Sequence, residues 1–115
     1  MDENIIVEKS LDFAVRIVNV YKHLTAEKNE YVMSKQLLRS GTSIGANVAE
    51  GERGQSRPDF YSKMSIALKE ASEAKYWITL LHRTEYLSAK EFESLSNDIK
   101  EILAILTAIC KAVNK

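Results

Sequence analysis

The segment from Ser88 to Val113, SAKEFESLSNDIKEILAILTAICKAV, carries the clearest helical pattern in the chain. Its large apolar residues are separated alternately by three and four positions: Phe92, Leu95, Ile99, Ile102, Leu106, Ile109 and Val113. This spacing keeps one side of an α-helix apolar and is typical of helices that pack in bundles. Ser88, followed three residues later by Glu91, is the capping-box pattern of a helix start. The segment therefore predicts a helix that begins at Ser88 and buries one face against other helices.

Three more helices are expected upstream, over about residues 5–24, 31–52 and 58–84. The links between them are short and polar, and short links place consecutive helices antiparallel. Only 4 Gly and 1 Pro occur in 115 residues, too few for the many turns of an all-β fold. We therefore expect an all-α fold, an up-and-down antiparallel four-helix bundle, formed by residues 1–115 as a single domain.

The middle of the second helix is unusual because the run SGTSIGANVA, from Ser40 to Ala49, carries no charge. Gly, Ser, Thr and Asn are poor helix formers, so packing must hold this part of the helix. Gly41, Gly45 and Ala49 are spaced by four residues, which lets another backbone approach closely. The alanines of the third helix are the expected partners of this glycine side.

The first helix has only one narrow polar stripe, made of Asp12, Arg16, Asn19 and His23. The rest of its surface is apolar, whereas a bundle helix needs only one buried face. A second apolar face predicts a contact with another subunit. The candidate residues for this oligomer interface are Phe13, Ile17, Val20 and Leu24.

The balance of charge limits the classes of partner. There are 16 basic and 16 acidic residues, whereas a non-specific nucleic-acid binder usually has a basic excess, so such binding would need clustered charge. No apolar run reaches the roughly 20 residues of a membrane span, and the N-terminal residues do not resemble a signal peptide. Cys110 is the only cysteine, so no internal disulfide can form. These features predict a soluble cytoplasmic protein.

The chain lacks the ligand patterns of the common bundle metal sites. Neither His23 nor His82 follows a Glu by three positions, as di-iron bundles require, and two His with one Cys fit a zinc site poorly. We therefore predict no metal, no cofactor and no catalytic residue. One weak alternative is a ribonuclease that uses Arg16 and His23, which lie two turns apart on the polar stripe. Chance occurrence on a solvent-facing stripe is the other interpretation.

Polar residues along the second and third helices suggest a binding surface. Its candidate residues are Arg39, Asn47, Glu50, Arg53, Arg57, Lys63 and Trp77. The four basic residues bracket the turn between the two helices and could contact phosphates. The alternative is structural: the line Ser40, Ser43, Asn47 and Glu50 would make hydrogen bonds between helices instead.

The stretch from Ser34 to Leu81 resembles the bacterial four helix bundle protein family, whose founding members are encoded by intervening sequences within 23S ribosomal RNA genes. The resemblance rests on LLRSGTSIGAN at 37–47, AEG at 49–51, Asp59-Phe60, Lys69-Glu70, Glu73 and Tyr76-Trp77. It implies a four-helix bundle that assembles as a homopentamer, and it supports no catalytic residues. The chain is also similar to the accessory protein of diversity-generating retroelements, a pentameric bundle that binds a reverse transcriptase and nucleic acid through a basic surface.

Together these features predict a non-enzymatic, homo-oligomeric bundle, a pentamer by the family resemblance, that binds RNA or a ribonucleoprotein partner. The alternative is a protein-interaction scaffold with no nucleic-acid role, which zero net charge favours. The Arg16/His23 ribonuclease is the third hypothesis.

Overall fold

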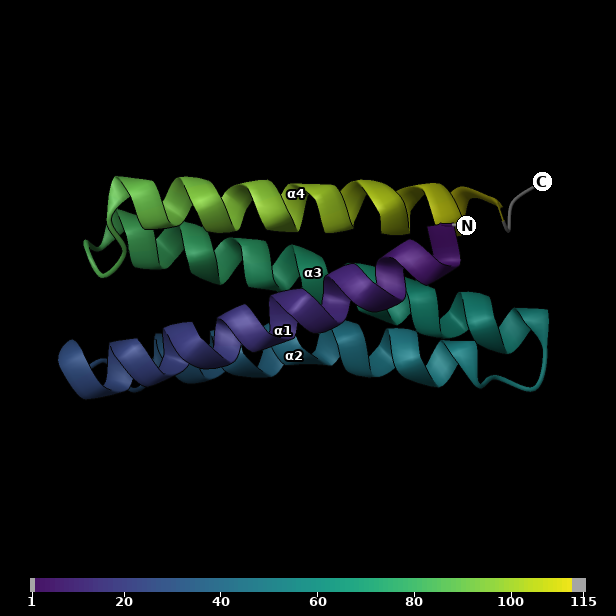
Figure 1. The fold of residues 1–115 in the computed structure, drawn as a ribbon, viewed down its shortest axis with the longest axis horizontal. Helices are drawn as coiled ribbons and strands as arrows, with labels where there is room; N and C mark the ends of the chain where they lie inside the picture. Colours follow the sequence, from purple (N-terminus) through teal and green to yellow (C-terminus); the bar gives the residue numbers. More distant parts are fainter. Residues whose placement is uncertain (1, 113–115) are drawn as a thin grey trace.

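The computed structural model describes residues 2–112, and the side chains of residues 4–112. It contains four helices: α1 (Asp2–Glu27), α2 (Met33–Glu52), α3 (Arg57–Arg83) and α4 (Ala89–Ala112). Figure 1 shows them side by side in an elongated bundle with short turns at its two ends, and the molecule measures 44 × 21 × 19 Å. This arrangement confirms the all-α, up-and-down four-helix bundle. Helix α1 is longer at both ends than the expected range 5–24.

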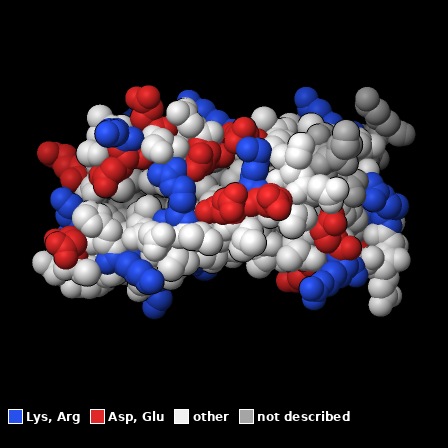
Figure 2. Space-filling view, viewed as in Figure 1, with Lys and Arg blue, Asp and Glu red and all other residues white. Residues whose placement is uncertain are grey.

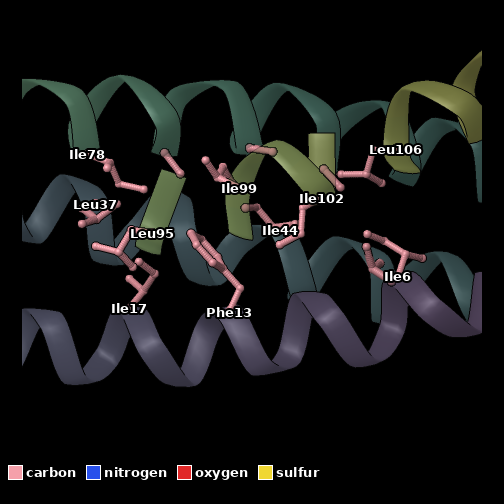
Figure 3. Close-up of a cluster of buried hydrophobic side chains, with 14 of the residues drawn as sticks. Ile6, Phe13, Ile17, Leu37, Ile44, Ile78, Leu95, Ile99, Ile102 and Leu106 are labelled. Atoms are coloured by element: carbon pink, nitrogen blue, oxygen red, sulfur yellow. The ribbon is translucent and has the colours of Figure 1, made fainter. Parts of the chain in front are cut away.

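One face of every helix contributes to a single core (Figure 3). On α4, the predicted stripe is buried at Leu95, Ile99, Ile102, Leu106 and Ile109, while Phe92 is partly buried and Val113 lies outside the described residues. Burial of each such large side chain contributes about 1.5–3 kcal/mol relative to exposure. The alternation of three and four positions therefore identified the packing face of this helix correctly.

The glycine side of α2 contacts α1, not the alanines of α3 as expected. A Cβ atom at Gly41 would lie 2.9 Å from the side chain of Ile17, and one at Gly45 would lie 3.2 Å from the carbonyl oxygen of Ser10. The alanines of α3 are instead buried in the core, and Ala49 is exposed. The expectation was wrong because four-residue spacing marks a close approach without indicating which neighbour makes it.

The residues expected to form an oligomer interface lie inside the chain's own core. Phe13, Ile17 and Leu24 are at most 2% exposed, and Val20 packs partly buried against the same core. They continue the core stripe that starts at Ile6, because their spacing of three and four positions keeps them on one side of α1. Phe13, Ile17 and Leu24 therefore have almost no surface left for a contact between subunits, and their assignment to such a contact was wrong, whereas Val20 keeps part of its surface exposed.

A buried carboxylate fixes the turn between α1 and α2. Glu30 is 7% exposed, and its carboxylate accepts hydrogen bonds from the backbone N–H groups of Val32 (3.1 Å), Met33 (3.0 Å) and Ser34 (2.6 Å). Burial acts to raise the pKa of Glu30, but the bonds from Ser34, Met33 and Val32 together hold that pKa below its ordinary value. Glu30 thus satisfies the first N–H groups of α2 and orders the turn.

At the same end of the molecule, a capping box starts α4 as predicted. The Ser88 N–H donates to the Glu91 carboxylate at 2.7 Å, and the Glu91 N–H donates to the Ser88 hydroxyl at 3.1 Å. His82 stacks on Phe92 with ring centroids 4.2 Å apart, and its Nδ1 lies 3.2 Å from the carbonyl oxygen of Leu87. Within residues 2–112, no helix is both long enough and apolar enough to cross a membrane.

Replacing Glu30 by Gln keeps the shape of the side chain but weakens its three hydrogen bonds. We expect Glu30→Gln to lower the free energy of unfolding by about 1–3 kcal/mol at pH 7, since bonds to a charged acceptor are stronger than neutral ones. Because the folded pKa is depressed, the charged carboxylate stabilises the fold above its ordinary pKa, and this stabilisation is lost as pH falls through the folded pKa. Urea unfolding of both proteins between pH 7 and pH 3 should show the two stabilities converging; a constant difference would contradict this role.

Candidate functional site

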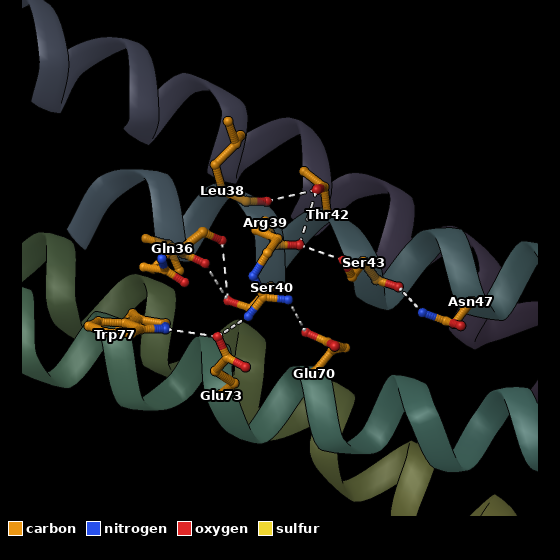
Figure 4. Close-up of polar contacts among 11 residues, drawn as sticks. Gln36, Leu38, Arg39, Ser40, Thr42, Ser43, Asn47, Glu70, Glu73 and Trp77 are labelled. Atoms are coloured by element: carbon orange, nitrogen blue, oxygen red, sulfur yellow. Dashed lines mark hydrogen bonds and ion pairs between the residues drawn. The ribbon is translucent and has the colours of Figure 1, made fainter. Parts of the chain in front are cut away.

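Arg39 lies at the centre of a polar network between α2 and α3 (Figure 4). Its guanidinium forms ion pairs with Glu70, at 3.2 Å, and with Glu73, and the indole N–H of Trp77 donates to the same Glu73 carboxylate at 3.1 Å. The bond from Arg39, followed by that from Trp77, lowers the pKa of Glu73, while Glu73 raises the pKa of Arg39. Two carboxylates therefore match the charge of Arg39, which leaves it poorly suited to a phosphate.

The polar line on α2 makes contacts within the bundle. The Ser43 hydroxyl donates to the carbonyl oxygen of Arg39 at 2.6 Å, and the Asn47 amide donates to that of Ser43 at 2.8 Å. Glu50 forms an ion pair with Lys63 of α3 at 3.0 Å. The hydrogen bonds of Ser43 and Asn47 stay within α2, so the hydrogen bonds between helices that the structural interpretation expected are not formed there. Of the Ser43–Asn47–Glu50 line, only Glu50 makes a polar contact with another helix in the described part of the chain.

Arg53 and Arg57 lie at the turn between α2 and α3. The Arg57 guanidinium sits 4.7 Å from the ring centroid of Phe60 and 5.2 Å from that of Tyr61. Arg53 is exposed and forms no ion pair with any residue in the described part of the chain. A hollow of about 380 Å³ beside them is lined by Gly51, Glu52, Gly54, Gln55, Ser56, Arg57 and Phe60.

The seven candidate residues thus do follow the α2–α3 side, but they do not form one basic surface. Acidic partners match Arg39 and Lys63, whereas Arg53 at the turn is exposed and forms no ion pair with the described residues. Trp77 is half-buried and meets the exposed Tyr76 edge to face, with centroids 5.0 Å apart. On the face shown in Figure 2, basic and acidic side chains are interleaved without a large area of one sign.

Between α1 and α4, two ion pairs join the helices: Lys9 with Glu101 at 2.9 Å and Arg16 with Asp98 at 2.5 Å. Next to them is a hollow of about 300 Å³, lined by Arg16, Asn19, Val20, His23, Leu87, Glu91 and Leu95. Arg16 and His23 therefore do line one hollow, as the ribonuclease hypothesis requires. However, Asp98 holds Arg16, and the helix cap holds Glu91.

Sequence patterns identified neither Glu91 as part of this hollow nor Asp98 as the partner of Arg16, because acidic residues on the polar side of α4 give no signal for which neighbour they face. In residues 2–112, no group of three His, Cys, Asp or Glu side chains is placed to hold a metal ion. Cys110 is partly buried, and this burial raises the pKa of its thiol.

Exposed apolar side chains occur where α1 packs on α2. Leu11 is 62% exposed and Val15 is 56% exposed, and both lie outside the core stripe of α1. Gly41 faces Ile17 and Gly45 faces Ser10, so this part of α1 runs beside the uncharged run of α2. We define the outer α1–α2 face as Leu11, Val15, Val18, Thr42, Ala46 and Ala49. Two features of the sequence indicated this face: the run 40–49, which has no charged residue, and the second apolar face of α1.

The Arg39 network can be tested as a stabilising contact. Exposed ion pairs contribute about 0.2–1 kcal/mol, so a double-mutant cycle of Arg39→Met and Glu73→Gln should give a coupling energy in that range at pH 7. Because the folded pKa of Glu73 is lowered, the coupling should disappear as pH falls through that value. Lys69→Met, at an exposed position on the same helix, is the control and should leave the stability nearly unchanged. Zero coupling at pH 7 would show that the network does not stabilise the bundle.

Comparison with known proteins supports the four-helix fold and identifies the family. Residues 2–108 match the family model described as 23S rRNA-intervening sequence protein. A crystal structure at 1.70 Å resolution of a protein of unknown function from the S23 ribosomal protein family of Bacteroides thetaiotaomicron is 58% identical, with a TM-score of 0.94, and the match covers 96% of this chain and 99% of that chain. No curated protein matches the chain. The chain belongs to the 23S rRNA-intervening sequence protein family.

Proposed function

We propose that the chain is a non-enzymatic helical bundle that assembles into a homo-oligomer through the outer α1–α2 face. The observation that carries this proposal is the exposure of Leu11 and Val15 beside a run of α2 that has no charge. Contiguous apolar areas on the surface of a protein mark sites of interaction. Figure 2 shows an area without charged side chains in the lower middle of the view, where α1 lies over α2 in Figure 1.

The proposal that the chain is not an enzyme is supported by the contacts that its polar side chains already make. The side chains best suited to chemistry are held by one another: Arg16 by Asp98, Arg39 by two glutamates, and Glu91 by the start of α4. A catalytic acid or base needs a free lone pair or proton within reach of the substrate. The pentameric form is what the family resemblance implies, and a ring of that kind joins two different faces of neighbouring copies.

Charged substitutions in the outer α1–α2 face should abolish assembly. We expect Leu11→Glu/Val15→Glu to reduce the mass in solution, measured by light scattering at micromolar concentration, to that of one 13.0 kDa chain. The helical circular dichroism should persist, because neither side chain is in the core. Tyr76→Glu, at a residue that is 57% exposed on α3, is the matched control and should leave the mass unchanged. A monomeric wild-type protein, or a double variant that stays assembled, would contradict the proposal.

RNA binding at the α2–α3 turn is the second candidate function. It is favoured by the exposed Arg53, by Arg57 next to it, and by the link of the family to 23S ribosomal RNA genes. The likeness to the accessory protein of diversity-generating retroelements points in the same direction. An oligomer would carry one such turn in each copy. Several weak RNA-binding sites that are linked together bind far more tightly than a single site. Repetition would thus compensate for a net charge of zero.

The turn can be tested by electrophoretic shift with a structured RNA at about 50 mM and 200 mM salt. We expect binding that weakens steeply with salt, and Arg53→Ala should lower both the affinity and the salt dependence, since one phosphate contact is lost. Arg39→Ala is the control, because carboxylates already match its charge, and its binding should equal that of the wild type. Absence of binding at the lower salt would leave the protein-interaction scaffold as the function, with no role for nucleic acid.

A further inference from the structure

The side of α3 that faces away from the core carries positive charge and an exposed aromatic ring. We define the outer α3 face by exposed residues that recur at intervals of three, four or seven positions and therefore lie on one side of the helix: Ser62, Ser65, Lys69, Ser72, Tyr76 and Arg83. Lys75 is exposed next to Tyr76. Lys69, Lys75 and Arg83 form no ion pair with any residue in the described part of the chain. These three cations are therefore available to an anionic partner.

The acidic residues of α3 lie elsewhere on the helix. Glu70 and Glu73 point toward α2, where both form ion pairs with Arg39 (Figure 4). Asp59, the third acidic residue, lies in the first turn of α3. The chain as a whole has no net charge, but its outer α3 face combines cations with neutral hydroxyl groups. A polyanion is the partner whose charge complements such a face.

The ring of Tyr76 is exposed but supported by a neighbour that is held in place. Tyr76 is 57% exposed and meets the indole of Trp77 edge to face, with ring centroids 5.0 Å apart. Trp77 packs half-buried against the core, and its indole N–H donates to Glu73 at 3.1 Å. A ring that is held before contact loses little entropy on binding, and an exposed aromatic ring stacks on unpaired bases. Lys69 and Arg83 each lie seven residues from Tyr76, about 10 Å along the helix.

We propose that single-stranded RNA binds along the outer α3 face, with one base stacked on Tyr76. Lys69, Lys75 and Arg83 contact the phosphates on both sides of this base. The proposal rests on the RNA binding given above as the second candidate function, and it adds a surface beyond the turn at Arg53 and a class of RNA.

The position of α3 in the bundle is compatible with self-assembly. In the described part of the chain, α3 packs on α2 and α4 but does not pack on α1. An oligomer joined through the outer α1–α2 face therefore leaves the outer α3 face open to RNA. Because every base has a flat aromatic face, stacking is tolerant of sequence, and we expect little sequence preference.

Fluorescence tests the stacking contact, because Trp77 is the only tryptophan of the chain and lies against Tyr76. An oligouridine of about 12 nucleotides is titrated at about 50 mM salt; the anisotropy of a labelled sample gives the affinity, and the emission of Trp77 with an unlabelled sample reports a base at Tyr76. We expect binding to quench Trp77. Tyr76→Ala should lower the affinity about fivefold or more, because the stacked base loses its ring, whereas Tyr76→Phe should bind like the wild type. Tyr31→Ala, at a tyrosine that is 58% exposed, is the matched control and should leave the affinity unchanged.

Salt dependence tests the phosphate contacts separately. Lys69→Gln should weaken binding and reduce the slope of log affinity against log salt by about one, because one phosphate contact is lost. Lys22→Gln, at an exposed lysine on α1, is the matched control and should change neither quantity. The circular dichroism of all these variants should match that of the wild type, since none of the residues is in the core.

The same titration with Arg53→Ala separates this proposal from the one on which it rests. Affinity that falls in Tyr76→Ala and Lys69→Gln, but not in the two controls, supports binding along α3. Affinity that falls in Arg53→Ala but is unchanged in Tyr76→Ala overturns the placement on α3 and leaves binding at the turn intact. Emission of Trp77 that does not change at saturating RNA also overturns stacking at Tyr76. Absence of binding at about 50 mM salt overturns both proposals.

Discussion

The close approach of α1 to the glycine side of α2 is the constraint on which the other features depend. Gly45 lies against the backbone of Ser10, where an added Cβ would be 3.2 Å from a carbonyl oxygen, and Gly41 lies against Ile17. Backbone cannot move aside as the end of a long side chain can, so this contact fixes the rotation of α2 about its own axis. With that rotation set, Arg39 and Glu50 face α3. Leu11 and Val15 remain outside.

This arrangement divides the surface into two kinds of region. Along the α2–α3 side, charged side chains form ion pairs with one another, so they stabilise the bundle and have little capacity left for a ligand. Along the α1–α2 side and at the end that contains Tyr31 and Val32, large apolar side chains are exposed to solvent. Contacts between copies would therefore be mainly apolar, with the basic turn at Arg53 remaining exposed for another partner.

Much of the fold could be predicted from the sequence because its strongest signals are local. The alternation of apolar residues on α4 and the Ser88–Glu91 capping box depend on residues three or four positions apart, and both were identified correctly. The partner of the glycine side was not, because spacing within a helix does not identify the neighbouring helix. Phe13 and Ile17 were misassigned for a related reason: α1 is apolar on most of its surface, so periodicity could not distinguish its inner face from its outer one.

The candidate site was harder to predict, since its residues are defined by contacts between helices. Arg39 and Lys63 looked available for phosphates, but their charges are matched by glutamates more than ten residues away in the sequence. Glu30 was missed because it caps α2 from three residues before the first helical residue, which differs from the usual position of a helix cap.

If the copies assemble through apolar contacts, the mass of the particle in solution should not fall as the salt concentration rises. Light scattering at about 0.05 M and 1 M salt compares conditions in which surface charges interact and conditions in which they are screened. We expect an oligomer whose mass is the same, or greater, at the higher salt, because apolar association does not weaken with screening. A particle that dissociates at high salt, or a monomer in both conditions, would contradict assembly through apolar contacts.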